Sequence, residues 1–442
     1  MVYRAGLTKI LAFVSLSFVF PASAAVPGST LEDFFTAAIN YSPDLQIAQE
    51  SLNISAARKK AANGQLLPQI NAGGSVSDNR LSQFNNFQKF DGERYYLSLT
   101  QVLFNWQAFS VRKQAYLLED QLEEEYYYQL AFLLTDVAEK YFNVLQAEDA
   151  VDSIASEIDA VTNQLNQIQS LYDRQLAQIT DLYQGRASLA AVQAEQLLLE
   201  AEVALSREAL RSISGLDVGP LYILTDEAEI TPLEFSQQYY VQQARERNHQ
   251  VLAREYALRV AEEGISERRG AYMPQVSFIA QRQDSDVGFD NLPINRTDNT
   301  YIGLNVQIPL YAGGSNRAAV SEASSRRSIA EYELRATQLE TRAAVRAAHL
   351  QVQSSEAQAN AGRILVESTA LAAEAMQQGF LLGTVTSVDV LNALRDQYQA
   401  ERELQRTRYE HVKYLLLLKR ETGTLNSEDL LEVGSWLEPA QP

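Results

Sequence analysis

Apolar residues recur at alternating intervals of three and four over two long stretches of this 442-residue chain. This heptad spacing is typical of helices that pack side by side as coiled coils. Proline, which breaks helices, is absent from 69 to 219 and from 310 to 438. The pattern predicts two long helical regions, and a helix from about Trp106 to Gln175 would reach roughly 100 Å at 1.5 Å per residue. The spacing is clearest at Val151, Ile154, Ile158, Val161, Leu165, Ile168 and Tyr172.

Each helical region follows two stretches in which polar and apolar residues alternate, as they do in a strand. We expect strands at about 69–79, 94–104, 275–285 and 299–309. Each has the length of a tilted strand that crosses a bilayer. Polar and apolar faces are typical of a membrane barrel and equally of a soluble hairpin on a helical core. The alternation alone leaves both interpretations open.

The chain repeats itself at an offset of about 206 to 208 residues. Leu103-Phe104 recurs as Leu310-Tyr311, and the aspartates Asp181 and Asp389 align. We therefore expect two structural repeats, each with two strands and long helices. Their expected bounds are 25–216 for the first repeat, 217–232 for a linker, 233–424 for the second repeat and 425–442 for a C-terminal tail.

The N-terminus predicts export from the cytoplasm. Arg4 and Lys9 precede an apolar run at 10–20, which ends before Ala22-Ser23-Ala24. This order is typical of a secretory signal peptide, expected at residues 1–24, and the run is too short for a membrane anchor. Four strands cannot close a barrel, and an open sheet in lipid would leave backbone groups unpaired. If the strands enter a membrane, several chains must share one barrel.

Composition excludes several kinds of chemistry. The formal charge of −19 makes the chain a poor binder of nucleic acid, which requires a basic surface. The absence of cysteine excludes disulfides and thiolate metal sites. His249, His349 and His411 have no partners at metal-ligand spacing. No cofactor motif and no catalytic constellation is recognisable, so we expect no cofactor and no enzyme.

Several short motifs, some of which occur once in each repeat, resemble those of the TolC family of bacterial outer-membrane efflux proteins. They are Tyr41-Ser42-Pro43 before Leu45, Leu66 with Pro68-Gln69-Ile70, Met273-Pro274-Gln275-Val276, Leu103-Phe104-Asn105-Trp106, Pro309-Leu310-Tyr311-Ala312-Gly313-Gly314 and Gly423-Thr424-Leu425-Asn426. The resemblance covers essentially the whole mature chain.

The resemblance implies a mainly α-helical chain with a small membrane β-barrel. Three copies would share twelve strands in the outer membrane and continue into a periplasmic helical tunnel. The duct would serve a tripartite efflux pump or type I secretion. Its expected partners are a periplasmic adaptor, an inner-membrane pump of the RND, ABC or MFS type, and outer-membrane lipid. The alternative is a periplasmic coiled-coil scaffold or adaptor without a pore, which the heptads alone would fit.

The resemblance also implies a periplasmic gate lined by Asp389 and Asn392, with Asp181 and Gln184 at the aligned places. Many family members have a second aspartate where Asn392 stands, so we expect three ring charges here rather than six. Like charges crowded on an axis raise pKa values and attract cations.

Two helix turns are the expected adaptor-docking tips, and two short segments are the expected strand-to-helix junctions. Family members often have an arginine latch where Val385 stands, and Gly-Leu at the counterpart turn. The tip residues are Gln175, Leu176, Leu382, Gly383, Thr384 and Val385, and the junction residues are Phe104, Trp106, Pro309, Gly313 and Gly314. Because only the second junction has a glycine pair, we expect the two junctions to turn differently.

Overall fold

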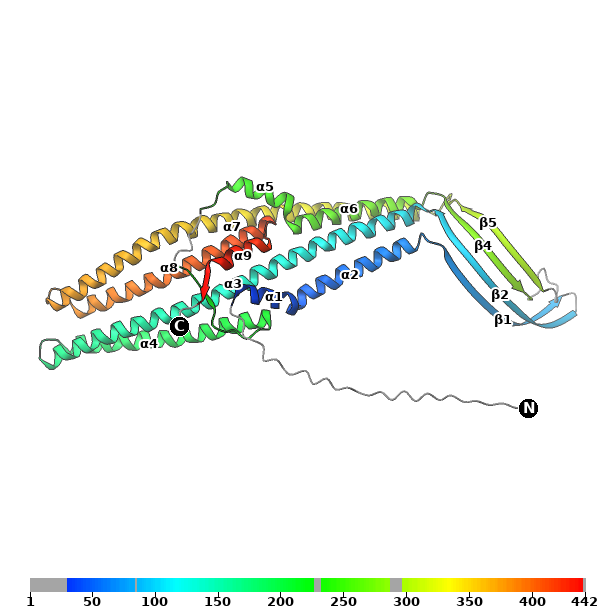
Figure 1. The fold of residues 1–442 in the computed structure, drawn as a ribbon. Coiled ribbons are helices and arrows are strands. Elements are labelled where there is room, and N and C mark those ends of the chain that lie inside the picture. Colours follow the sequence, from blue (N-terminus) through cyan, green and yellow to red (C-terminus); the bar gives the residue numbers. More distant parts are fainter. Residues whose placement is uncertain (1–29, 84–85, 226–231, 287–295, 440–442) are drawn as a thin grey trace, which may run out of the picture.

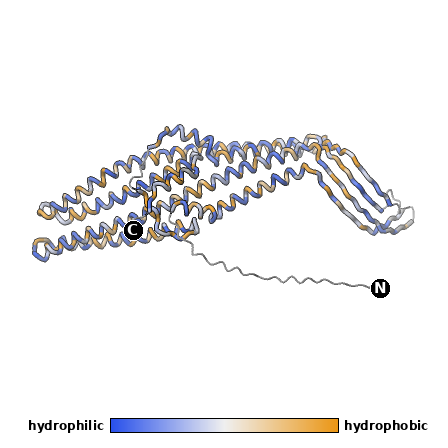
Figure 2. The backbone as a smooth tube through the Cα atoms, viewed as in Figure 1, coloured by the Kyte–Doolittle hydropathy of each residue, from blue (hydrophilic) through white to orange (hydrophobic). Residues whose placement is uncertain are grey.

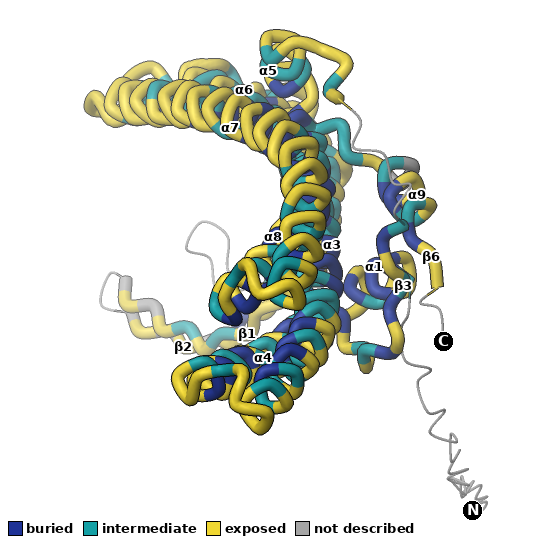
Figure 3. Tube along the Cα trace, turned by 90° about the vertical axis from the view of Figure 1, so that its left-hand side faces the viewer, coloured by how far each residue is buried: buried dark blue, intermediate teal, exposed yellow. Residues whose placement is uncertain are grey.

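The structure is a computed structural model that describes residues 30–83, 86–225, 232–286 and 296–439. The expected signal peptide lies outside these residues. The molecule is elongated, with a four-stranded sheet at one end and two helical hairpin tips at the other (Figure 1). Seen along its length, the helices form an arc, with α1, α9, β3 and β6 on the convex side (Figure 3).

The order helix, helix, strand, strand, long helix, helix occurs twice. The first series is α1 (Leu31–Tyr41), α2 (Pro43–Gly64), β1 (Gln69–Gln83), β2 (Asn86–Phe104), α3 (Trp106–Asp173) and α4 (Ile179–Ser214). The second is α5 (Gln237–Arg247), α6 (His249–Gly270), β4 (Gln275–Ser285), β5 (Thr297–Gln307), α7 (Ser315–Leu381) and α8 (Ser387–Thr422). Three short elements connect and follow them: β3 (Tyr222–Leu224), α9 (Ser427–Ser435) and β6 (Leu437–Pro439).

The first long helix has the length that the sequence predicts, and the second lies within the second proline-free region. α3 has 68 residues and α7 has 67. Ile154, Val161 and Ile168, seven residues apart on α3, are buried at 1% exposure or less, so the apolar seam faces a partner helix. Hydrophobic segments recur at intervals along the helices (Figure 2). Among the described residues, no helix has both the length and the apolar composition that crossing a membrane requires.

The sheet has the order β1-β2-β4-β5, and all neighbours are antiparallel. Its register separates two faces, because side chains directly opposite each other share a face. One such row is Ile70, Leu99, Ala280 and Ile302, and the adjacent row is Gln69, Thr100, Ile279 and Gly303. Large apolar side chains on the first face are exposed, among them Ile70, Leu97, Ile302, Leu304 and Val306. The alternation predicted from the sequence is thus present across all four strands.

The expected strand bounds need correction at four ends. β1 continues to Gln83, where an end at 79 was expected, and β2 begins at Asn86, where a start at 94 was expected. Both strands are longer because the polar part of this hairpin remains paired as far as Gln83 and Asn86. β5 covers Thr297–Gln307 where 299–309 was expected. Gln307 pairs with Gln275, the first residue of β4, so the ladder ends where its partner strand begins.

The linker and the tail are joined into a ribbon that the sequence did not predict. β3 pairs with β6 in an antiparallel two-stranded sheet. Buried Tyr141 of α3 holds it, because its hydroxyl donates to the Tyr222 carbonyl at 2.9 Å and accepts from the Tyr222 N–H at 3.0 Å. The main hydrophobic core lies beneath this ribbon and includes Phe34, Phe142 and Leu416.

His411 of α8 makes the stability of the folded chain depend on pH. It is 2% exposed, and its Nδ1 lies 2.9 Å from the Ser355 hydroxyl oxygen of α7. Burial lowers the pKa of His411 to about 4. The unfolded chain therefore binds a proton more readily between about pH 6.5 and 4, and stability is lost as the pH falls through that window.

We expect His411→Gln to flatten this pH dependence. The wild-type chain should lose about 2 kcal/mol of unfolding free energy between pH 8 and pH 5 through this group, because one pKa unit corresponds to about 1.36 kcal/mol. The measurement is the midpoint of chemical denaturation in detergent at pH 8, 7, 6 and 5. A variant whose midpoint declines with pH as steeply as that of the wild type would refute the assignment.

Candidate functional site

The two hairpin tips have the same backbone construction. In the α3–α4 tip the Leu176 N–H donates to the Leu171 carbonyl at 2.8 Å, and in the α7–α8 tip the Thr384 N–H donates to the Gly379 carbonyl at 2.9 Å. Both are Schellman closures, which require a left-handed residue before the donor. That residue is Gln175 in the first tip, with φ of 61°, and Gly383 in the second, with φ of 75°.

Gln175 is therefore a strained position. Among the described residues other than glycine, it is the one with a positive φ. A left-handed conformation brings Cβ close to the carbonyl oxygen and costs roughly 1 to 2 kcal/mol, whereas glycine adopts it freely. Gln175 and Gly383 are 208 residues apart, which is the offset of the sequence repeat. The first tip thus adopts the turn of the second without its glycine.

Asp389, an expected gate residue, lies in the first turn of α8 and forms its capping box. The Thr386 N–H donates to Asp389 Oδ2 at 2.9 Å, and the Thr386 hydroxyl donates to the same oxygen at 2.7 Å. In return the Asp389 N–H donates to the Thr386 hydroxyl oxygen at 3.3 Å. These bonds lower the pKa of Asp389, which opposes the rise that crowding of like charges would cause.

Asp181 occupies the corresponding place at the start of α4. The Gln178 N–H donates to Asp181 Oδ2 at 3.3 Å, a longer bond than its counterpart in α8. Asn392 and Gln184 lie one turn further along their helices, and both are exposed. Both hairpins end at the same end of the molecule, so all four expected gate residues lie there (Figure 1).

The remaining expected tip residues differ in exposure. Leu176 is 72% exposed and Leu382 is 79% exposed, although both are large and apolar. Val385 is half-buried against a small cluster formed by Ala373, Val390 and Leu394. The two tips therefore each present an exposed leucine, while Val385 packs inward.

The two strand-to-helix junctions turn differently, as the glycine pair predicted. At the first, a single residue, Asn105, separates β2 from α3, and its side chain accepts from the Ala108 N–H at 3.2 Å. Trp106 donates from Nε1 to the Ser266 hydroxyl oxygen at 3.1 Å and so joins the two repeats. Phe104 packs edge to face on Phe109.

The second junction is a seven-residue connection, 308–314. Gly313 and Gly314 have φ of 60° and 85°, a region that side chains rarely adopt, and Gly314 is the N-cap of α7 without a side-chain bond. Pro309 lies in this connection and not at the end of the strand, where it was expected.

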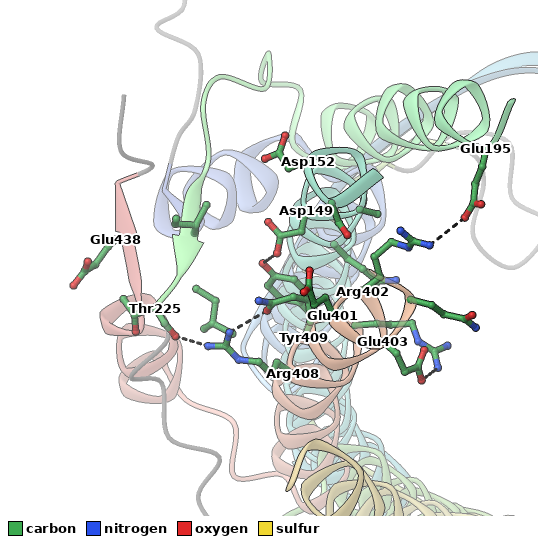
Figure 4. Close-up of a pocket in the computed structure, with 18 of the residues that line it drawn as sticks. Asp149, Asp152, Glu195, Thr225, Glu401, Arg402, Glu403, Arg408, Tyr409 and Glu438 are labelled. Carbon is green, nitrogen blue, oxygen red and sulfur yellow. Dashed lines mark hydrogen bonds and ion pairs between the residues drawn. The ribbon is translucent and has the colours of Figure 1, made fainter. Parts of the chain in front are cut away.

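A charged cleft of about 1320 Å³ lies between α3, α4, α8 and the ribbon (Figure 4). Arg402 donates from Nη1 to Glu157 Oε2 at 2.7 Å and lies 3.6 Å from Glu195. Glu157 is 1% exposed, and burial raises its pKa. Through Glu157 and Glu195, Arg402 connects α8 to both α3 and α4, the helices of the first hairpin.

The same cleft fixes α8 to the ribbon and to α3. Arg408 donates from Nη2 to the Thr225 carbonyl at 2.5 Å, and the Tyr409 hydroxyl donates to Asp149 at 2.6 Å. These partners are about 180 or more residues apart, and no local sequence signal marks them. By contrast, the capping role of Thr386 follows from its Thr-x-x-Asp spacing.

No metal centre accompanies these sites. Across the described ranges, no three or more His, Asp or Glu side chains are grouped so that they could hold a metal ion. The geometry is that of helix turns, junctions and a packed cleft.

Comparisons with known proteins agree with this geometry. The family model "Outer membrane efflux protein" matches residues 36–216 and 240–424. The outer membrane protein TolC of Vibrio cholerae is 28% identical over 424 residues, which cover 95% of this chain and 96% of that protein. The alkaline protease secretion protein AprF of Pseudomonas aeruginosa is 25% identical over 411 residues, covering 90% and 85%. The crystal structure of the outer membrane protein VceC from Vibrio cholerae shares the fold, with a TM-score of 0.76, 18% identity and coverage of 89% and 96%.

Fold and site define a duct-forming transport protein, not an enzyme: a sheet with one apolar exposed face leads directly into long coiled-coil hairpins. The chain belongs to the outer membrane efflux protein family, whose model matches most of its length. It is an outer-membrane exit duct for efflux or secretion with a periplasmic helical extension. The alternative of a scaffold without a pore finds no support among its relatives.

We expect Gln175→Gly to stabilise the α3–α4 tip by about 1 kcal/mol, because glycine relieves the left-handed strain. The matched change Gly383→Gln should destabilise the α7–α8 tip by a similar amount. Hydrogen exchange of the Leu176 and Thr384 amides measures the local opening of each tip. Unchanged or faster exchange at Leu176 in the glycine variant would contradict the strain.

Proposed function

We propose that three copies of this chain form one continuous duct whose helical end is a gate opened by an adaptor. The observation on which this rests is the sheet. Its outer strands β1 and β5 each have one partner within the chain. In hydrocarbon, every backbone donor and acceptor needs a partner, so β1 of one copy must pair with β5 of the next. Three copies give twelve strands, a number that closes a barrel.

The helical half also has edges that need partners. α7 has exposed apolar residues every seven positions on a face that its own chain does not cover, and α4 has a similar stripe. On α7 the residues are Ile329, Ala336, Ala343, Leu350, Ala357, Ile364 and Leu371, and on α4 they are Tyr183, Ala190, Leu197, Leu198, Ala204 and Leu205. Heptad stripes of this kind pack on a partner helix. In a ring, α7 of one copy would pack on α4 of the next.

The gate residues of each copy would then meet on the axis. Asp389 would contribute one carboxylate per copy, and exposed Asn392 would add an uncharged ring. A ring of three carboxylates attracts divalent cations. The exposed Leu176 and Leu382 at the tips are the surfaces that a periplasmic adaptor would cover, and an inner-membrane pump would supply the energy.

We expect Leu198→Glu to prevent assembly of the ring. Leu198 is 73% exposed in the single chain, and a glutamate buried there would be an unpaired charge in every interface, which is strongly destabilising. Chemical cross-linking in detergent should then show at least tenfold fewer trimers. Asn163→Glu, at an exposed position of α3 outside both stripes, is the matched control and should assemble normally. Trimers in undiminished yield from the leucine variant would exclude α4 from the interface.

We expect Asp389→Asn to weaken the block of ion conductance by divalent cations roughly tenfold, because the axial charge is removed. The measurement is the half-maximal blocking concentration in planar bilayers. Thr386→Ala is the control, since it removes the cap and keeps the charge, and it should leave the block intact. Asn392→Asp should strengthen the block. If Thr386→Ala weakens the block as much as Asp389→Asn does, the cap of α8 and not the charge of Asp389 governs the block.

A further inference from the structure

We propose that the ends of α2, α3, α6 and α7 nearest the sheet form a basic collar that binds the anionic headgroups of phospholipids on the periplasmic side of the outer membrane. The collar consists of the twelve helical residues nearest the sheet in each helix: 53–64, 106–117, 259–270 and 315–326. These four ends meet the sheet at one level (Figure 1). The proposal depends on the outer-membrane location of the chain and not on the gate.

The collar has the opposite charge from the rest of the molecule. It contains ten basic and four acidic residues, whereas the whole chain has 37 and 56. α2 and α3 contribute five of the basic residues and no acidic ones. Such a local excess of positive charge on an acidic chain is an electrostatic footprint for an anionic surface.

Much of this charge is free to bind a ligand. Lys59 and Lys113 have their own partners in the chain, Glu119 and Glu263. Among the described residues, however, several exposed collar cations have no carboxylate within ion-pair distance. They are Arg58, Lys60, Arg112, Arg259, Arg268, Arg269 and Arg317.

The collar lies at the level where headgroups would be. Arg268 and Arg269 lie in the last turn of α6, seven and six positions before Gln275, the first residue of β4. Trp106 and Tyr272, both partly exposed, lie at the same junctions, and such aromatic side chains are typical of membrane–water interfaces. Beyond them the apolar face of the sheet begins.

The residue types fit phosphate. The guanidinium group of arginine offers a planar fork that donates to two phosphate oxygens at once. Three of the seven collar cations without a carboxylate partner, Arg268, Arg269 and Arg317, are arginines on the two helices that flank β4 and β5. Contacts between these side chains and lipid phosphates would set the depth of the barrel in the membrane. A phosphatidylglycerol bilayer surface offers that chemistry, whereas phosphatidylcholine neutralises its phosphate internally.

The test compares lipid binding to the assembled full chain in detergent, measured by native mass spectrometry. The wild-type protein should bind phosphatidylglycerol at least tenfold more tightly than phosphatidylcholine. The combined variant Arg268→Gln, Arg269→Gln and Arg317→Gln should reduce that preference roughly tenfold or more, because each cation near an anionic surface contributes to attraction. Raising the salt concentration should weaken phosphatidylglycerol binding to the wild-type protein.

The control variant removes three exposed arginines of α7 outside the collar: Arg335→Gln, Arg342→Gln and Arg363→Gln. It should retain the lipid preference of the wild type. Equal loss in both variants would show a general charge effect and overturn the proposal, as would displacement of the lipid by millimolar inorganic phosphate. Altered ion selectivity of the channel in the collar variant, with unchanged lipid binding, would place these side chains in the lumen and overturn it too. If the collar variant fails to assemble, the wild-type protein still tests the proposal. The absence of a preference for phosphatidylglycerol, or a preference that salt does not weaken, would overturn it.

Discussion

The structure depends on one constraint: a backbone N–H or C=O that enters hydrocarbon must have a hydrogen-bond partner. A single chain meets it between β1 and β2, β2 and β4, and β4 and β5, but not at the outer edges of β1 and β5. The proposed ring of copies would supply the partners that these two edges lack. The helical half is consistent with the same ring, since the heptad stripes on α4 and α7 lie at the two edges of the arc (Figure 3). A ring that satisfies the backbone hydrogen bonds in the membrane would also cover the exposed apolar stripes of α4 and α7, which lie far from the membrane.

The sheet is suited to lipid and the helices to water, and the two junctions connect these parts. In the sheet, side chains alternate between an exposed apolar face and a polar face, whereas the helices bury an apolar seam and expose charge. Between them, Asn105 caps α3 with its side chain, and Gly314 begins α7 in a left-handed conformation. The excess of basic residues occurs in these same few helical turns. Composition therefore varies along the long axis with the medium expected at each level.

Periodic and local signals predicted most of the fold, and contacts across long sequence separations escaped them. Proline-free heptads predicted α3 and α7 because coiled-coil packing needs only spacing along one chain. The ribbon escaped because Tyr222–Leu224 pairs with Leu437–Pro439, three residues on each side and more than 200 positions apart. The buried pair of Glu157 and Arg402 escaped for the same reason. The positions of the expected gate residues were accessible through the resemblance, and the cap that joins Thr386 to Asp389 has a local signal in its Thr-x-x-Asp spacing.

That capping geometry constrains how a gate at this position would work. The carboxylate of Asp389 is bonded to both the backbone and the hydroxyl of Thr386, so it cannot swing aside without uncapping the first turn of α8. A change in the width of the gate would then require movement of the helix and not a change of rotamer. Further along, Arg402 holds α8 to the buried Glu157 of α3, and removing one partner of such a pair is costly. Between these two points Val390 and Leu394 are buried against Ala373 of α7, so a movement of this part of α8 would carry the end of α7 with it.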